Sequence, residues 1–470
     1  MKKTAKAVFL FILFKKKEIL MTLSVVILAA GKGTRMFSDK PKVLHKLSNQ
    51  PLLQYVINTV KQLKPLNINV VVGYKSEEIK KEFPKDDVNW VNQTEQLGTG
   101  HAVKSATSFF KGSQIIVLYG DVPLVNIDDL QKLIKISEGG LGILTFSKEF
   151  PKGYGRIKRL KDEVIGIIEE KDCSESEKKI NEINTGIMCI DSDKLKKWLP
   201  QIKNNNSQKE YYLTDIVDLA KRDNVKIHTY EAKNEITISG INSKVELIAM
   251  EKMIKQKKND DLIEQGVNII DPLRTEIRGT LNCGSDVEID VGCIFEGDVK
   301  LGNNVKIGAY SHIIQSSIFD NTNVKPYSHI ESSEVGDNNN IGPYARLRPG
   351  AKTKENVNIG NFVEIKNSKI GRGTKINHLS YVGDSEVGEN VNIGAGCITC
   401  NYDGVNKHKT VIENDVFVGS NSQLVAPLKI SAGSTIGAGS TITKDTPANQ
   451  LSLSRSKQTS IPSWERPKKK

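Results

Sequence analysis

The sequence of 470 residues has few cysteines and lacks an apolar run long enough to span a membrane. Six cysteines in a chain of this size do not form a disulfide framework. Cys397 and Cys400 form one C-x-x-C pair without the second pair that a zinc site needs, so we interpret them as small core side chains. The apolar run at 8–14 is shorter than the roughly 20 residues that cross a bilayer. No membrane partner is therefore expected.

A basic stripe with interleaved aromatic residues is also lacking, although the net charge is +12. Six lysines against one glutamate at 1–20, together with the three lysines at 468–470, supply +8 of that charge. The remaining charge is spread over the rest of the chain, so no nucleic-acid partner is predicted. With 38% hydrophobic and 26% charged residues, the composition is that of a globular protein, and the length favours two domains.

The first twenty residues imitate a signal peptide without completing one. Lys2, Lys3 and Lys6 precede the apolar run, and 15–17 is a second group of lysines where a small-residue cleavage site would be expected. We interpret residues 1–20 as a non-native or disordered extension and expect translation to start at Met21.

An alternation of apolar strands with amphipathic stretches follows. Strands are predicted at 24–28, 69–72 and 114–119, and a helix is predicted at 43–63. This order indicates an α/β domain over 21–244, with a Rossmann-like, mostly parallel sheet covered by helices on both faces. Ligands bind such sheets at the carboxyl ends of the strands. Helical spacing of apolar residues then predicts a linker helix over 245–266.

From 267 to 470 apolar residues recur at every sixth position instead. A period of six fits neither a helix nor one continuous strand, and it is the signature of hexapeptide repeats that stack into a parallel β-helix. Each hexad forms a short strand and a turn, with its apolar residue pointing into the core. The predicted inward residues are Ile289, Phe295, Leu301, Ile307, Ile313, Phe319, Val335, Ile341, Leu347, Ile359, Ile365, Ile370, Ile376, Val382, Ile412, Val418, Leu424, Ile430, Ile436 and Ile442.

The first chemical motif is a Gly-rich turn after the strand at 24–28. It reads Leu-Ala-Ala-Gly-Lys-Gly-Thr-Arg over 28–35 and continues to Pro41 and Lys42. Such a turn lets backbone N–H groups approach phosphates, and Arg35 and Lys42 can neutralise a triphosphate. The full arrangement resembles the sugar-1-phosphate nucleotidyltransferase family, and later segments follow in the order of that family.

This resemblance implies uridylyl transfer from UTP to a sugar 1-phosphate, with release of pyrophosphate. Arg35 and Lys42 would be catalytic, and Asp121 and Asn242 would hold Mg²⁺, because both reactants are anions whose repulsion must be offset. The implied contacts to UTP and to the UDP-sugar are Leu28, Ala29, Ala30, Gly31, Lys42, Gln93, Gly98, Thr99, Tyr119, Gly120, Asp121, Gly155, Glu169, Asn184 and Asn242.

Polar residues interrupt the hexads between Arg348 and Tyr402, where a purely structural rod would not require them. They resemble the acetyltransferase domain of a family of bifunctional enzymes that make UDP-N-acetylglucosamine. His378 would be the base that takes a proton from the attacking amine. Glucosamine 1-phosphate would contact Arg348, Lys366, Tyr381 and Asn392. Acetyl-coenzyme A would contact Ala395, Asn401, Tyr402, Ser420, Ala438 and Arg455.

The resemblance covers about 21–467 and implies left-handed coils, a cytoplasmic homotrimer, and a product that feeds cell-wall synthesis. Two alternatives stay open. One is a single-function sugar-1-phosphate nucleotidyltransferase whose β-helix serves only assembly. The other is a regulatory scaffold that has lost activity, against which the presence of Arg35, Lys42, Asp121 and Asn242 argues.

Overall fold

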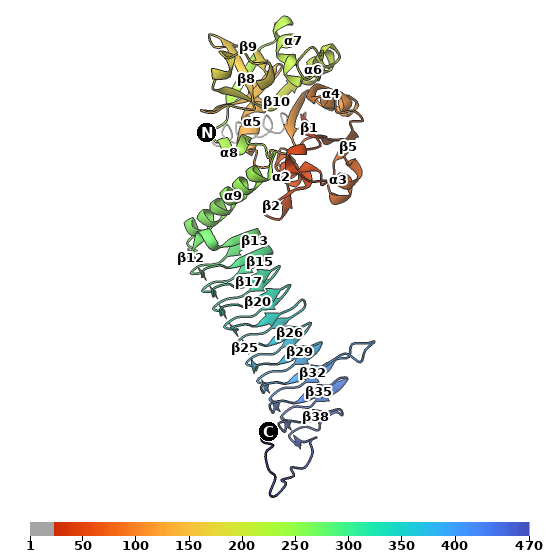
Figure 1. Ribbon diagram of the computed structural model, residues 1–470, viewed down its shortest axis with the longest axis vertical. Coiled ribbons are helices and arrows are strands. Elements are labelled where there is room, and N and C mark those ends of the chain that lie inside the picture. The colour runs from red at the N-terminus through yellow and green to blue at the C-terminus, as the bar shows by residue number, and fades with distance from the viewer. Residues whose placement is uncertain (1–22, 470) are drawn as a thin grey trace, which may run out of the picture. The chain divides into compact units, whose positions relative to one another are not determined.

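The computed structural model describes residues 23–469, which form two compact units that divide between Glu251 and Lys252 (Figure 1). The extension expected at 1–20 and the start expected at Met21 lie outside these residues. Helix α9 (Lys244–Glu264) runs across the division, and the domain boundaries at 244 and 266 stay predictions. Within 23–469, every helix is too short or too polar to cross a bilayer.

The first unit is built on a mixed nine-stranded sheet with the order β11-β7-β10-β6-β1-β4-β5, extended by β8 beside β10 and by β9 beside β8. Neighbours along β6-β1-β4-β5 are parallel, whereas β10 is antiparallel to both β6 and β7. The predicted parallel arrangement is therefore confirmed for β5, β4, β1 and β6, whereas the whole sheet is mixed. The strands are β1 (Leu23–Ala29), β4 (Asn67–Val72), β5 (Asn89–Asn92), β6 (Gln114–Tyr119), β7 (Leu141–Ser147), β8 (Gly155–Leu160), β9 (Glu163–Ile168), β10 (Glu182–Asp191) and β11 (Ile227–Glu231).

Two hydrophobic cores cover the two faces of this sheet. Successive residues of a strand point to opposite faces, and Val25 and Ile27 of β1 belong to one core while Val26 and Leu28 belong to the other. Because β1 is buried on both faces, its sequence is a continuous apolar run. The helices of this unit are α2 (Leu52–Lys61), α3 (Ser76–Glu82), α4 (Thr99–Ser105), α5 (Ile127–Ile136), α6 (Ser192–Trp198), α7 (Ile216–Arg222) and α8 (Glu235–Ile238).

The single helix predicted over 43–63 is wrong in its first half. A tight hairpin of β2 (Lys46–Leu47) and β3 (Gln50–Pro51) precedes α2. Ser48 and Asn49 at its tip both have positive φ, a conformation that a helix cannot contain. Pro51, which suits the start of a helix but not its interior, then leads into α2.

The second unit is a stack of short parallel strands, consistent with a β-helix (Figure 1). Along one face Ile289 pairs with Ile307, Ile307 with Val324, and Val324 with Ile341, so that equivalent positions recur every 17 or 18 residues, or three hexads. This face is formed by β12 (Asn268–Ile269), β14 (Glu288–Ile289), β16 (Lys306–Ile307), β19 (Asn323–Val324), β22 (Asn340–Ile341), β25 (Asn358–Asn361), β28 (Lys375–His378), β31 (Asn392–Ile393), β34 (Phe417–Val418), β37 (Thr435–Ile436) and β39 (Leu451–Ser452).

A second sheet of 17 strands supplies the remaining sides of the coils. Its strands are β13 (Glu276–Cys283), β15 (Ile294–Leu301), β17 (His312–Ile314), β18 (Ser317–Ile318), β20 (His329–Glu331), β21 (Glu334–Val335), β23 (Arg346–Leu347), β24 (Lys352–Thr353), β26 (Glu364–Lys366), β27 (Lys369–Ile370), β29 (Tyr381–Gly383), β30 (Ser385–Val387), β32 (Ile398–Cys400), β33 (Thr410–Ile412), β35 (Gln423–Val425), β36 (Leu428–Ile430) and β38 (Thr441–Ile442).

The predicted inward residues are buried in one continuous core, with one exception. Phe319 is 48% exposed, and its neighbour Ile318 is buried in its place. The corner between β17 and β18 is one residue shorter than a hexad because Gln315 turns the chain with positive φ. Ser316, buried behind this corner, donates to the Ile314 carbonyl oxygen at 2.7 Å. The inward series therefore changes phase at Ile318, and it changes phase again at Val335, which follows the buried Ile330 after five residues.

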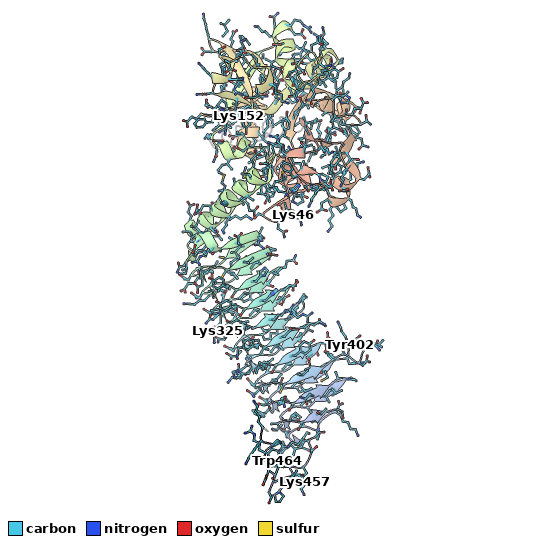
Figure 2. The ribbon with its side chains drawn as sticks, in the orientation of Figure 1. Lys46, Lys152, Lys325, Tyr402, Lys457 and Trp464 are labelled. Atoms are coloured by element: carbon cyan, nitrogen blue, oxygen red, sulfur yellow. The ribbon has the colours of Figure 1, made fainter. Side chains whose placement is uncertain are left out.

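One long loop interrupts the stack. The step from Ile393 to its partner Val418 is 25 residues instead of 17 or 18, because residues 401–409 leave the coil between β32 and β33. Tyr402 lies on this projecting loop (Figure 2). Nearby Cys397 is buried, in agreement with its interpretation as a core side chain, whereas Cys400 is only partly buried.

Candidate active sites

A cleft of about 350 Å³ opens at the carboxyl ends of the parallel strands β1, β5 and β6 in the first unit. Sequence analysis selected eleven of its lining residues, which are Leu28, Ala29, Ala30, Gly31, Lys42, Gln93, Gly98, Thr99, Tyr119, Asp121 and Asn242. Four others also line it, namely Val43, Gln96, Ala102 and Glu210. Glu210 arrives from a distant loop, and no motif of the sequence marks it.

The Gly-rich turn brings Lys42 into the cleft. Gly33 has a φ of 68°, and a Cβ at this position would lie 2.6 Å from the Cβ of Lys42. Only glycine therefore lets the turn fold against the stem of Lys42. Arg35 lies in the short helix after Gly33, is exposed, and does not line the cleft. The structure thus separates the two cations that the sequence grouped together.

The Lys42 ammonium lies between the two predicted metal ligands. It donates to Oδ2 of Asp121 and, over 3.1 Å, to Oδ1 of Asn242. The backbone N–H of Ile241 donates to the Asp121 carbonyl oxygen at 2.9 Å, which ties the two ligand segments together. The N–H of Asn242 is bonded to a carboxylate oxygen of Glu246 at 2.5 Å, which fixes it further.

This donor set fits Mg²⁺. One carboxylate and one amide oxygen converge on a single cation, here an ammonium, and oxygen donors of these kinds are those that Mg²⁺ prefers. Among residues 23–469 no cluster of three or more His, Cys, Asp or Glu side chains could hold a metal ion. Two protein ligands are nonetheless enough for Mg²⁺, which commonly keeps waters and substrate phosphates as its other ligands.

Gln93 and Thr99 shape the far wall of the cleft. The Gln93 side chain is buried, and its Nε2 lies 3.3 Å from the Gly98 carbonyl oxygen and 3.0 Å from Nδ1 of His101. Thr99 Oγ1 accepts a 2.9 Å hydrogen bond from the backbone N–H of Leu213. A buried, hydrogen-bonded amide at the edge of a cleft suits recognition of a planar base.

Three of the predicted contacts to UTP and the UDP-sugar, Gly155, Glu169 and Asn184, lie together beyond the cleft lining. Gly155 pairs with Asn184 across β8 and β10, and a Cβ at Gly155 would lie 3.4 Å from Oε2 of Glu169. Burial raises the pKa of Glu169, to which Thr214 donates at 3.2 Å.

Tyr119 joins this group to the cleft. Burial, and then the nearby charges of Glu169 and Asp121, raise the pKa of Tyr119, so its hydroxyl stays protonated. Gly186 has a φ of 82°, and a Cβ there would lie 2.3 Å from the Tyr119 ring. Gly120 packs against Ala29 behind the cleft rather than lining it.

A second polar group lies on the 17-stranded sheet of the stack. Arg348 donates to Oε1 of Glu364 at 2.8 Å, and Glu364 pairs in register with Tyr381 of the next coil. Contact with the Lys407 amine, followed by partial burial, lowers the pKa of Lys366. Lys407 belongs to the projecting loop. The sequence did not predict its contact with Lys366, because the two residues are brought together only by the stacking of the coils. Asn392 lies on the other sheet, in β31, so one chain does not bring it into this group.

His378 heads a column of small side chains at one corner of the stack. It pairs with Asn361 above it, and its Nδ1 lies 2.8 Å from Asn361 Oδ1. Because Ile376 pairs with Ile393, Val418 and then Ile436 in successive coils, the positions below His378 are Ala395, Ser420 and Ala438. The structure therefore aligns the predicted base with three of the predicted acetyl-coenzyme A contacts.

The other three predicted contacts of acetyl-coenzyme A lie at the edges of this region. Arg455 donates to the Ala438 carbonyl oxygen at 2.9 Å, which joins it to the column. Asn401 is buried at the base of the projecting loop, where its amide donates to the Asp384 carboxylate. Tyr402 is 61% exposed, and its hydroxyl lies 2.5 Å from the Gly404 carbonyl oxygen.

Two segments of the chain match known protein families, and two solved structures are similar to about half of the chain. Residues 25–154 match the MobA-like NTP transferase domain, and residues 277–353 match the GMPPB C-terminal domain. The first unit thus contains a nucleotidyltransferase domain. A UDP-glucose pyrophosphorylase complexed with UDP-glucose shares 18% identity with this chain at a TM-score of 0.43, covering 50% of this chain and 100% of its own. A Bacillus anthracis protein assigned as a glucose-1-phosphate thymidylyltransferase, in complex with a sucrose, shares 19% identity at a TM-score of 0.40, with 49% and 94% covered.

Proposed function

We propose that this chain is a bifunctional N-acetylglucosamine-1-phosphate uridyltransferase and glucosamine-1-phosphate N-acetyltransferase. It would acetylate glucosamine 1-phosphate with acetyl-coenzyme A, and then couple the product to UTP to form UDP-N-acetylglucosamine. The observation that supports acetyl transfer by the second unit is the position of His378, which lies directly above a column of small side chains. A passive rod has no need of an exposed, hydrogen-bonded histidine at such a place.

For uridylyl transfer, a phosphate oxygen of the sugar 1-phosphate attacks the α-phosphorus of UTP, and pyrophosphate leaves. Lys42, in the cleft, and Arg35, exposed in the short helix after Gly33, would offset the charge of the two anions as they meet. Mg²⁺ held by Asp121 and Asn242 would supply further positive charge there. Gln93, Gly98 and Thr99 would orient the uracil, and Gly155, Glu169 and Asn184 would bind the sugar. No protein nucleophile is required.

For acetyl transfer, the amine nitrogen of glucosamine 1-phosphate attacks the thioester carbon, and the coenzyme A thiolate leaves. If Nδ1–H of His378 donates to Asn361 Oδ1, then Nε2 carries the free electron pair that accepts the amine proton. Ala395, Ser420 and Ala438 leave a shallow strip below His378 along which an extended thioester could lie. Asn401, Tyr402 and Arg455 would bind its other end.

The second polar group is suited to bind the phosphate of glucosamine 1-phosphate. Lys366 in β26 and Tyr381 in β29 lie on one sheet, and Arg348 directly follows β23 of the same sheet, so that together they provide two cations and a hydroxyl. Asn392, on the other sheet, would act from a neighbouring chain, which supports a trimer whose acetyl-transfer sites lie between left-handed coils.

A single-function nucleotidyltransferase with a structural stack is the second candidate. The match to the GMPPB C-terminal domain over 277–353 favours it, since it includes Arg348 but ends before Lys366 and His378. The two candidates differ in whether the chain releases coenzyme A.

One experiment separates them. The purified protein is incubated with glucosamine 1-phosphate, acetyl-coenzyme A, UTP and Mg²⁺, and the products are identified by mass. UDP-N-acetylglucosamine with free coenzyme A and pyrophosphate is the expected result. A parallel reaction contains N-acetylglucosamine 1-phosphate, UTP and Mg²⁺. UDP-sugar formed only in this parallel reaction would support the single-function enzyme, and no product in either reaction would indicate an inactive scaffold.

A further inference from the structure

The position of the Lys42 ammonium between Asp121 and Asn242 has a consequence for metal binding. We propose that Lys42 is a built-in cation that occupies the metal position of the empty enzyme, so that Mg²⁺ binds only when Lys42 moves away. Besides its proposed role in offsetting the charge of the substrates, Lys42 then couples metal binding to nucleotide binding. This inference rests on the proposed roles of Asp121 and Asn242 as metal ligands.

Competition follows from the shared oxygens. The two oxygens that a divalent cation would use are those to which the ammonium donates, and the segments that carry them are linked by the hydrogen bond from Ile241 to Asp121. A second cation in the same space would meet Lys42 at contact distance, where like charges repel strongly at a site largely closed to water. The side chains of Lys42 and Asp121 are only 15% and 14% exposed.

The structure also gives Lys42 a place to go. Its Cβ is held against Gly33, but three rotatable bonds between Cβ and Cε still allow the ammonium to move. Lys42 lines the same cleft as Gly31 and Ala30, whose turn is built to receive phosphates. A bound triphosphate would therefore attract the ammonium away from Asp121 and leave the two oxygens to the metal. Because coupling between ligands is reciprocal, bound metal would in turn favour bound nucleotide.

The first test follows Lys42 itself in the full-length chain. Lysine amines are methylated slowly with formaldehyde and cyanoborohydride, and the rate at each lysine is read by mass spectrometry. Without metal, Lys42 should react more slowly than the exposed Lys46 (Figure 2). With Mn²⁺ at a concentration that fills the site, the Lys42 rate should rise several-fold while the Lys46 rate stays constant. A methylation rate of Lys42 that is the same with and without bound Mn²⁺ would overturn the proposal.

The second test measures metal affinity without nucleotide, using Mn²⁺ and its electron paramagnetic resonance signal. Lys42→Met keeps most of the side-chain volume and removes the charge, so it should bind Mn²⁺ at least about tenfold more tightly than the parent, the size of an ordinary coupling. Lys46→Met is the matched control and should bind as the parent does. Equal or weaker binding by Lys42→Met, including no binding by either protein, would contradict the proposal.

These outcomes are independent of the proposed function. Both readouts report metal and lysine rather than product, so they can succeed in a protein that makes no UDP-sugar. A protein that makes UDP-N-acetylglucosamine but fails both tests would keep its function and lose only this role of Lys42.

Discussion

The Nδ1 atom of His378 lies 2.8 Å from the Oδ1 atom of Asn361, its in-register neighbour in the coil above. An amide oxygen can only accept, so in this amide orientation Nδ1 carries the proton and Nε2 is free to act as a base. The stacking of the coils, rather than any local motif, thereby sets the direction in which the imidazole can take a proton.

The replacement His378→Ala should lower acetyl transfer by about 10²–10⁴-fold, the usual effect of removing a positioned general base. His378 is exposed, so the core and the assembly state should be unchanged. Coenzyme A release is the measurement, and uridylyl transfer from supplied N-acetylglucosamine 1-phosphate is the control. Asn361→Ala should cost less, since the imidazole stays in place. Acetyl transfer at the parent rate by a folded His378→Ala protein would remove His378 as the base.

The replacement Asp121→Ala should abolish Mg²⁺-dependent uridylyl transfer, because losing a metal ligand typically removes several kcal/mol of transition-state stabilisation. It also releases Lys42 from its ion pair. Pyrophosphate release is the measurement. Acetyl transfer should be nearly intact, because Asp121 and His378 belong to different units. Normal UDP-sugar synthesis by this variant would exclude the metal role.

The change of phase at Ile318 predicts unequal losses of stability when each of two adjacent residues is replaced. Ile318→Ala removes a buried side chain from the stack and should lower the free energy of unfolding by about 2–4 kcal/mol. Phe319→Ala removes a larger but half-exposed ring and should cost less than about 1 kcal/mol. Thermal unfolding of the two variants checks this. A greater loss for Phe319→Ala would place the phenylalanine, not the isoleucine, in the core.

The stability of the first unit should depend on pH through Asp215. Burial, together with the charges of Asp218, Glu169 and Asp172, raises the pKa of Asp215 to about 6. A carboxyl with a raised pKa contributes stability that is complete below its ordinary value near 4 and is lost as the pH rises through about 6. Asp215→Asn, which stays neutral, should therefore gain stability relative to the parent between pH 5 and pH 8.

Because Asp215 is only half-buried and partly screened by water, we expect this gain to be about 1 kcal/mol. Urea unfolding at pH 5 and pH 8, followed by the fluorescence of Trp90 and Trp198, is the measurement. The exposed Asp193, replaced in Asp193→Asn, is the matched control and should show no such pH dependence. A gain that is equal at both pH values would show that the Asp215 carboxyl keeps its ordinary pKa.

Much of the fold follows from local patterns. The strand at 24–28 and the turn after it are apparent because a buried parallel strand needs a continuous apolar run and a phosphate-binding turn needs glycine. The hexad series is apparent because each inward residue is buried by the coils directly above and below it. The shortened corner before Ile318 also leaves a local sign, a buried serine that bonds back to the carbonyl oxygen of Ile314, but sequence spacing alone does not show it.

The sequence by itself determined the strand that ends at the Gly-rich turn, most of the residues of the stack that face inward, and the polar side chains that stand out from both patterns. Only the tertiary structure decided that Lys42 lies between Asp121 and Asn242, which is 200 residues away in the chain, and that His378 stands above Ala395, Ser420 and Ala438. The physical reason is that strand period and turn chemistry act over a few neighbouring residues. A site is instead assembled from side chains whose proximity depends on sheet order and coil register, and these arise only when the whole chain packs.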